Sequence, residues 1–170
     1  EAMLVSMGYD VVGQANSGEQ AIEMAKDLEP DVILMDIVMP GHMDGISAAE
    51  KIRSELEVAI VFLTGYGDLE YVERAKQVEP FGYVMKPWTD EEIRASVEIA
   101  FYKKEAEAAI RGSEKKYRSL FENSPIGIAV LDGERNILDF NDAMLEINGY
   151  TREDMGTIAN TSEYYYNPDD

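Results

Sequence analysis

The sequence has no cysteine, one histidine and one tryptophan among its 170 residues. Without cysteine, the chain has no disulfide bond, no thiol nucleophile and no thiolate metal ligand. No apolar run approaches the roughly 20 residues that a membrane-spanning helix needs. No GxGxxG or P-loop pattern is present to bind the phosphates of a nucleotide. We see no signal peptide, and we therefore expect a cytoplasmic protein.

Basic residues are also scarce. The 15 lysine and arginine residues face 34 aspartate and glutamate residues, which gives a formal net charge of −19. Phosphate backbones and anionic lipid surfaces repel such a chain. We therefore expect neither direct nucleic-acid binding nor membrane binding. His42, the only histidine, is expected to be an exposed loop residue rather than a phosphate donor or metal ligand.

The most informative stretch runs from Asp31 to Pro40 and reads DVILMDIVMP. Its short apolar run lacks alternation, which is typical of a strand covered on both faces by helices. Asp36 ends that run. In open α/β sheets, reactive groups gather beyond the carboxyl ends of the strands. Taken alone, Asp36 is equally well explained as the cap of a turn.

Short apolar runs alternate with amphipathic patterns along the first hundred residues. This alternation predicts an α/β domain with a doubly wound parallel sheet and right-handed crossovers. The expected strands are Tyr9–Ala15, Asp31–Asp36, Val58–Thr64 and Phe81–Met85. The expected helices are Gly18–Leu28, one carrying Ile46, Ala49, Ile52 and Leu56 on its apolar face, Leu69–Val78, and a long one beginning at Thr89.

Three of these strands end in polar residues at the same edge of the predicted sheet. Asp36, Thr64 and Lys86 would bring a carboxylate, a hydroxyl and an ammonium group to one site. Carboxylates form acyl-phosphate intermediates in phosphoryl transfer, and a positive charge favours that reaction. The three residues together therefore favour a chemical role for Asp36.

The segments DVILMDIVMPGHMDG, VFLTG and FGYVMKP, in this order and spacing, resemble the receiver domain of two-component response regulators. The resemblance implies that Asp36 is the phosphoacceptor. It further implies that Thr64 is the switch hydroxyl, that Lys86 pairs with the phosphate and that Tyr83 is the switch aromatic residue. Pro87 would hold the preceding peptide bond in the cis form, which occurs almost only before proline.

This resemblance covers residues 1–102 and implies a flavodoxin-like, five-stranded sheet of order 2-1-3-4-5. It also implies a Mg²⁺ ion bound by Asp36, the backbone carbonyl of Val38 and an acidic pair after the first strand. Neither that strand nor that pair is in this sequence. We expect about twenty preceding residues to be missing; the alternative is a receiver that binds metal poorly.

Beyond the receiver, residues 103–115 are predicted to form a helical linker. The whole helical pattern extends to Asn123, with Ile93, Val97, Ala100 and Phe101 forming the stripe that packs on the receiver. A solvated helix and a dimerising coiled coil through Ala106, Ala109 and Ile110 are equally consistent with the linker.

Residues 116–170 resemble the first part of a PAS sensor domain, through SLFENSPIGIAVLD and ILDFNDAMLEINGYTREDM. The expected elements are strands Ile126–Leu131 and Asn136–Phe140, then a helix capped by Asn141 that ends at Gly149. A PAS fold has five strands around a small pocket, and this stretch supplies two. The resemblance leaves the PAS ligand unknown.

We therefore expect a response regulator that takes a phosphoryl group from a partner histidine kinase and relays the change to a PAS module. It is expected not to be an enzyme beyond its own phosphotransfer and dephosphorylation. A homodimer through the receiver face or the linker helix is a further expectation. Two alternatives remain: a contact or dimerisation module that needs no phosphorylation, and the front end of a larger hybrid sensor histidine kinase.

Overall fold

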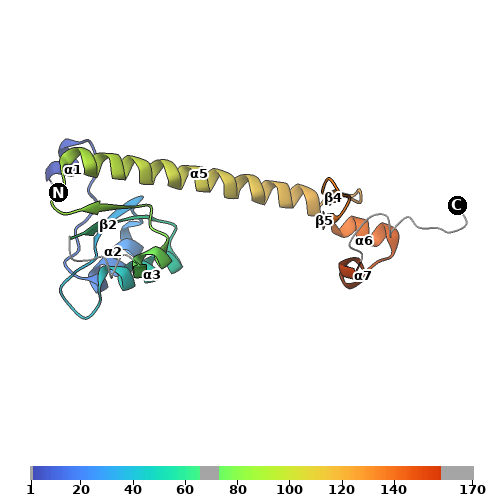
Figure 1. The fold of residues 1–170 in the computed structure, drawn as a ribbon, viewed down its shortest axis with the longest axis horizontal. Coiled ribbons are helices and arrows are strands. Elements are labelled where there is room, and N and C mark those ends of the chain that lie inside the picture. The colour runs from blue at the N-terminus through green and yellow to red at the C-terminus, as the bar shows by residue number, and fades with distance from the viewer. Residues whose placement is uncertain (1, 66–72, 158–170) are drawn as a thin grey trace, which may run out of the picture. The chain divides into compact units, whose positions relative to one another are not determined.

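The computed structural model describes residues 2–65 and 73–157, and the chain divides into two compact units, residues 1–108 and 109–170. The units are described separately. The first unit contains α1 (Ala2–Ser6), α2 (Gly18–Leu28), β1 (Val32–Asp36), α3 (Gly45–Glu55), β2 (Ala59–Thr64), η1 (Lys76–Val78) and β3 (Gly82–Met85). The helix α5 (Asp90–Glu122) begins in the first unit and ends in the second (Figure 1).

The sheet of the first unit is parallel and has the order β1-β2-β3. Asp36 pairs with Leu63, and Thr64 pairs with Met85, so the carboxyl ends of the three strands lie along one edge. The predicted α/β class and the doubly wound receiver fold are confirmed.

The sheet separates two apolar layers because successive side chains of a strand point to opposite faces. Ile60 and Phe62 of β2 pack with α2 and α3, whereas Ala59 and Val61 pack with α1 and the first turns of α5. Figure 1 shows α2 and α3 on one side of the sheet and α5 on the other. Buried on both faces, β2 is the non-alternating apolar strand that the sequence predicted.

The strand expected at Tyr9–Ala15 is wrong, because this segment forms no regular structure. Its backbone needs a paired neighbour, and no described strand lies beside the outer edge of β1. The segment instead runs close to α2. A Cβ added to Gly13 would lie 2.4 Å from the terminal methyl of Met24 and 2.9 Å from Leu28.

The helices begin where their capping residues predict. Ser17 accepts a hydrogen bond from the Gln20 amide at the start of α2, and Asp44 accepts one from the Ser47 amide at the start of α3. Thr89 and Glu92 bond each other's backbone amides before α5, in a capping box. Of the helix expected at Leu69–Val78, only residues 73–78 are described, and they are helical.

The long helix is continuous through Gly112 and Ser113. Ile93, Val97 and Ala100 are buried against the sheet, as predicted. Phe101 was wrongly placed in this stripe, because its side chain is 39% exposed. Residue 101 lies four positions after Val97, at the margin of the face centred on residues 93, 97 and 100, so part of its ring reaches solvent.

The second unit contains β4 (Ala129–Leu131), β5 (Ile137–Phe140), α6 (Asp142–Asn148) and α7 (Arg152–Thr157). The strands β4 and β5 form an antiparallel hairpin with an irregularity between Val130 and Leu131. Asn141 is fully buried and links this hairpin to its surroundings. It donates to the carbonyls of Phe121 and Ile126 and accepts from the amides of Ile128 and Met144.

Within the described part of the chain, none of the helices is long and apolar enough to cross a bilayer.

Candidate functional site

Asp36 is the last residue of β1, and the backbone of the next residue, Ile37, is bonded to β2 and to the start of α3. The Ile37 amide donates to the Leu63 carbonyl over 3.1 Å, and the Gly45 amide donates to the Ile37 carbonyl over 3.0 Å. The Asp36 side chain remains 34% exposed. The site therefore offers a carboxylate that solvent and a reactant can reach, on a backbone fixed by hydrogen bonds.

Lys86 lies directly after β3 and forms an ion pair with Asp36 through Nζ and Oδ2. The other carboxylate oxygen, Oδ1, accepts a hydrogen bond of 3.1 Å from the Val38 amide. The Lys86 amide in turn donates to the Thr64 carbonyl over 2.7 Å. The Lys86–Pro87 peptide bond is cis, as predicted. The structure thus joins two of the residues that the sequence assigned to one site.

Thr64 ends β2 at the same edge of the sheet and is 5% exposed. Its hydroxyl donates to the Gly65 carbonyl over 3.2 Å. In this arrangement the Thr64 hydroxyl is bonded to the backbone of the residue that directly follows β2. A role as the switch hydroxyl would require it to exchange this partner for a phosphoryl oxygen.

Tyr83 lies in β3, three residues before Lys86, with 36% of its side chain exposed. Its ring centroid is 6.0 Å from that of the buried Phe62. Burial raises the pKa of the Tyr83 hydroxyl above its ordinary value, although the positive charge of Lys76 acts in the opposite direction. The phenol is therefore a neutral hydrogen-bonding group at physiological pH.

Two residues beside the site were not singled out from the sequence. A Cβ on Gly45 would lie 1.9 Å from the carbonyl oxygen of Asp36, so only glycine fits there. Trp88 places its ring centroid 5.9 Å from Lys86 Nζ. The sequence KPW contained a signal for the second contact, since an aromatic residue two positions after the lysine stays near it in space.

Asp44 caps the start of α3, directly before Gly45, and pairs with a residue far along the chain. Its Oδ2 pairs with Arg74 Nη1 at 2.9 Å. Burial by itself would raise the pKa of Asp44, but the hydrogen bonds from Ser47 and the pairing with Arg74 leave the pKa below its ordinary value. Asp44 is therefore a charged cap at physiological pH.

The residues present match only part of a magnesium site. Mg²⁺ is commonly held by one or two carboxylates together with water and phosphate oxygens. Asp36 supplies one carboxylate here, and the Val38 carbonyl remains a prediction as a second ligand. No group of three His, Asp or Glu side chains that could hold a metal occurs within residues 2–65 and 73–157. His42 is an exposed loop residue, as predicted.

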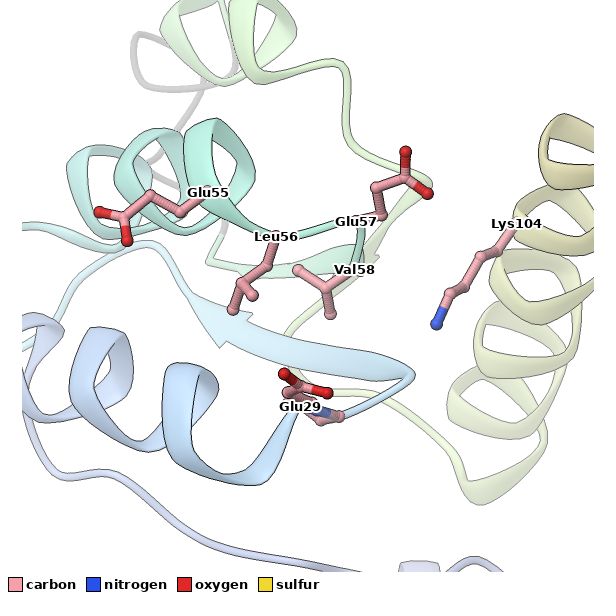
Figure 2. Close-up of a pocket in the computed structure, with 7 residues that line it drawn as sticks. Glu29, Glu55, Leu56, Glu57, Val58 and Lys104 are labelled. Atoms are coloured by element: carbon pink, nitrogen blue, oxygen red, sulfur yellow. The ribbon is translucent and has the colours of Figure 1, made fainter. Parts of the chain in front are cut away.

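A cavity of about 300 Å³ lies at the amino ends of the strands, opposite the end that carries Asp36 and Thr64 (Figure 2). Its lining includes Pro30, two residues before β1, and Val58, directly before β2. Figure 2 shows three glutamates and Lys104 around this cavity. Because Asp36 and Thr64 end the same strands, the cavity belongs to the far edge and takes no part in the site.

Comparison with known families agrees with this geometry. Residues 1–98 match the response regulator receiver domain, and residues 115–170 match the PAS domain. The chain therefore belongs to the response regulator receiver family, and a PAS domain follows its receiver domain.

Individual relatives cover the receiver most clearly. The transcriptional regulatory protein PdtaR of Mycobacterium tuberculosis is 38% identical over 98 residues, which are 58% of this chain and 47% of PdtaR. This chain thus spans about half the length of that relative.

The solved structures that resemble this chain include two from bacterial signalling proteins. One is the signal receiver domain of a modulated diguanylate cyclase from Desulfovibrio desulfuricans, with a TM-score of 0.59 and 40% identity, covering 62% of this chain and 84% of that one. The other is the N-terminal domain of a response regulator/sensory box/GGDEF protein from Carboxydothermus hydrogenoformans. It has a TM-score of 0.58 and 37% identity and covers 63% of this chain and 86% of its own.

Proposed function

We propose that this chain is the phosphoacceptor part of a two-component response regulator and that Asp36 receives its phosphoryl group from a partner histidine kinase. The observation that carries the proposal is the ion pair between Asp36 and Lys86 at the carboxyl edge of a receiver sheet. Its setting would be the cytoplasm, where such kinases present their phosphohistidine. The chain itself would contribute only its own phosphotransfer to Asp36 and the later dephosphorylation of that residue.

The transfer would proceed by attack of one Asp36 carboxylate oxygen on the phosphorus atom. A new O–P bond forms as the bond from phosphorus to the donor atom breaks, and the donor leaves with that electron pair. Lys86, already beside the carboxylate, would shift its ammonium group to a phosphoryl oxygen. A Mg²⁺ ion held by Asp36 and the Val38 carbonyl would neutralise further charge on the phosphoryl oxygens.

The signal would then leave the site through side chains. Thr64 would give up the Gly65 carbonyl and donate to the phosphoryl group, and Tyr83 would turn toward the space that Thr64 leaves. Tyr83 lies in β3 and Thr64 pairs with Met85 of the same strand, after which α5 begins and runs into the second unit. The phosphoryl group must therefore favour one of two existing conformations by interacting differently with each.

The test is phosphorylation of the full chain by acetyl phosphate and Mg²⁺, followed by intact-mass and peptide mass spectrometry. We expect one phosphoryl group per chain, located on Asp36. Asp36→Ala should take up none, whereas Asp10→Ala, an exposed carboxylate outside the site, should behave as wild type. Phosphate that still adds to the Asp36→Ala protein, or a wild-type chain that takes up none, would contradict the proposal.

A second candidate function is self-association without phosphorylation. Ile99, Ile110, Tyr117 and Leu120 of α5 are 52%, 67%, 46% and 66% exposed. With Ala106, they fall in one register of a coiled-coil seam, in which the intervening positions are the polar residues Lys103 and Ser113. This stripe favours a dimer of two such chains through the linker helix.

The domain order bears on the whole protein. The C. hydrogenoformans relative is described as a three-domain protein with a response regulator, a sensory box and a GGDEF domain. A receiver followed by a PAS domain is consistent with a multidomain signalling protein here too. The proposal therefore includes a further domain in the whole protein, either an output domain of that kind or the histidine kinase that the sequence left open.

A further inference from the structure

We propose that Trp88 is a positioning residue that holds the Lys86 ammonium group beside Asp36. The proposal rests on the proposed role of Asp36 as the phosphoacceptor. Trp88 is the only tryptophan of the chain, and its ring centroid lies 5.9 Å from Lys86 Nζ. A cation within about 6 Å of an aromatic ring face is attracted by the ring's quadrupole, and tryptophan attracts it most strongly.

Lys86 needs such support because only its backbone is fixed. The Lys86 amide is bonded to Thr64, but four flexible carbons separate that backbone from the ammonium group. The side chain is 38% exposed, so solvent competes for the charge. The Asp36 carboxylate and the Trp88 ring together restrict the ammonium group to the space between them.

Trp88 can provide this support because its own position does not depend on Lys86. Its half-buried ring packs against the apolar cluster that includes Val84, Ile93 and Val97. The residue after it, Thr89, is fixed by the capping box with Glu92. The core and the helix start therefore place the ring, and the ring places the ammonium group.

The support matters most when Lys86 leaves Asp36 for a phosphoryl oxygen. During that exchange the carboxylate no longer holds the ammonium group, whereas the ring still does. Attraction of the usual strength at a partly exposed site corresponds to a twofold to fivefold change in population. Removing the ring should therefore slow phosphorylation of Asp36 by about that factor.

The experiment is a double-mutant cycle on the full chain with Trp88→Leu, Lys86→Met and the double variant. Amide hydrogen exchange of the β2 peptide reports the stability of the receiver sheet in each protein. Loss of packing by Trp88→Leu occurs in both backgrounds and cancels in the cycle. We expect Trp88→Leu to lower β2 protection about twofold to fivefold more when Lys86 is present than in the Lys86→Met background.

The rate of Asp36 phosphorylation by acetyl phosphate is measured on the same proteins, with Trp88→Phe as the conservative variant. We expect Trp88→Leu to be about twofold to fivefold slower than wild type and Trp88→Phe to recover most of that loss. A merely structural tryptophan would give equal effects in both lysine backgrounds, and that result would overturn the proposal.

The two readouts separate the possible failures. If wild type is phosphorylated and the cycle shows no coupling, the role of Trp88 is wrong and the proposed function stands. If wild type takes up no phosphate, the proposed function fails, and the positioning role fails with it even when the cycle shows coupling.

Discussion

Gly45 lies against the backbone of Asp36, so closely that an added Cβ would stand 1.9 Å from the Asp36 carbonyl oxygen and 3.1 Å from Met35. The obstacle is backbone within the sheet, which cannot rotate aside as a flexible side chain can. The start of α3 therefore packs directly on the end of β1, at Asp36, the candidate phosphoacceptor.

Gly45→Ala should destabilise the receiver unit by about 1–3 kcal/mol, as overpacking usually does. It should also slow phosphorylation, because β1 and α3 must separate at Asp36. Amide hydrogen exchange of β1 and β2 measures the first effect, and acetyl phosphate labelling measures the second. Gly112→Ala is the matched control, because a Cβ there meets nothing within 4 Å and lies inside α5. It should leave both readouts unchanged; a Gly45→Ala protein as protected as wild type would contradict the packing argument.

Asp44→Ala should lower the free energy of unfolding of the receiver unit by about 1 kcal/mol at pH 7, because it removes the cap of α3 and the partner of Arg74. Folding lowers the pKa of the Asp44 carboxyl below its ordinary value of 3.8. The contribution of Asp44 to the free energy of unfolding is therefore complete at pH values above 3.8, and it is lost as the pH falls through the pKa of the folded state. The difference between wild type and variant should therefore shrink between pH 7 and pH 3 in urea unfolding of the receiver unit. Asp10→Ala should show no such change, and an equal difference at both pH values would count against the charged cap.

Asn141→Ala should destabilise the second unit by roughly 3 kcal/mol, because it leaves buried backbone groups without partners. Exchange of the β4 and β5 amides should rise strongly, while β2 of the first unit keeps its protection. Asn148→Ala is the matched control, because Asn148 is exposed and, among the described residues, its side chain bonds the nearby Met144. Similar effects of the two substitutions would show that the buried network does not stabilise this unit.

Ile110→Gln should weaken any self-association of the chain about tenfold or more, since it removes an apolar side chain that is 67% exposed on α5. Sedimentation velocity over a range of concentrations gives the dissociation constant. Ala108→Gln, also exposed on α5 but outside the proposed seam, should leave that constant unchanged. A wild-type chain that stays monomeric throughout would remove the second candidate function.

The sequence alone predicted where the polar ends of the strands meet. Parallel strands of similar length bring their last residues to one edge, so the closeness of Asp36 and Lys86 followed from two apolar runs and the residues that end them. The cis bond before Pro87 was expected from the resemblance to the receiver family, because proline permits the cis form while most bonds before proline are trans. The roles of Thr64 and Tyr83 in switching stay predictions, because they concern a second conformation.

Other features depended on contacts that no local pattern contains. Tyr9–Ala15 has the composition of a strand, but strand formation requires a neighbouring backbone, and β1 has none on that side among the described residues. Gly45 was visible only as a loop glycine, because its closeness to Asp36 arises when α3 packs on the sheet. Composition fixes which residues can form an element, whereas tertiary pairing decides whether they do.

The hydrogen bonds that fix Asp36 also limit how the molecule can respond to its own chemistry. The Ile37 amide bonds the Leu63 carbonyl, and β1 pairs with β2 along its whole length, so β1 cannot slide along β2 without breaking these bonds. The two signalling states would then share one strand register and differ in side-chain rotamers and loops. The backbone of the sheet would keep the same conformation in both states, while the side chains of Thr64, Tyr83 and Lys86 rotate relative to it.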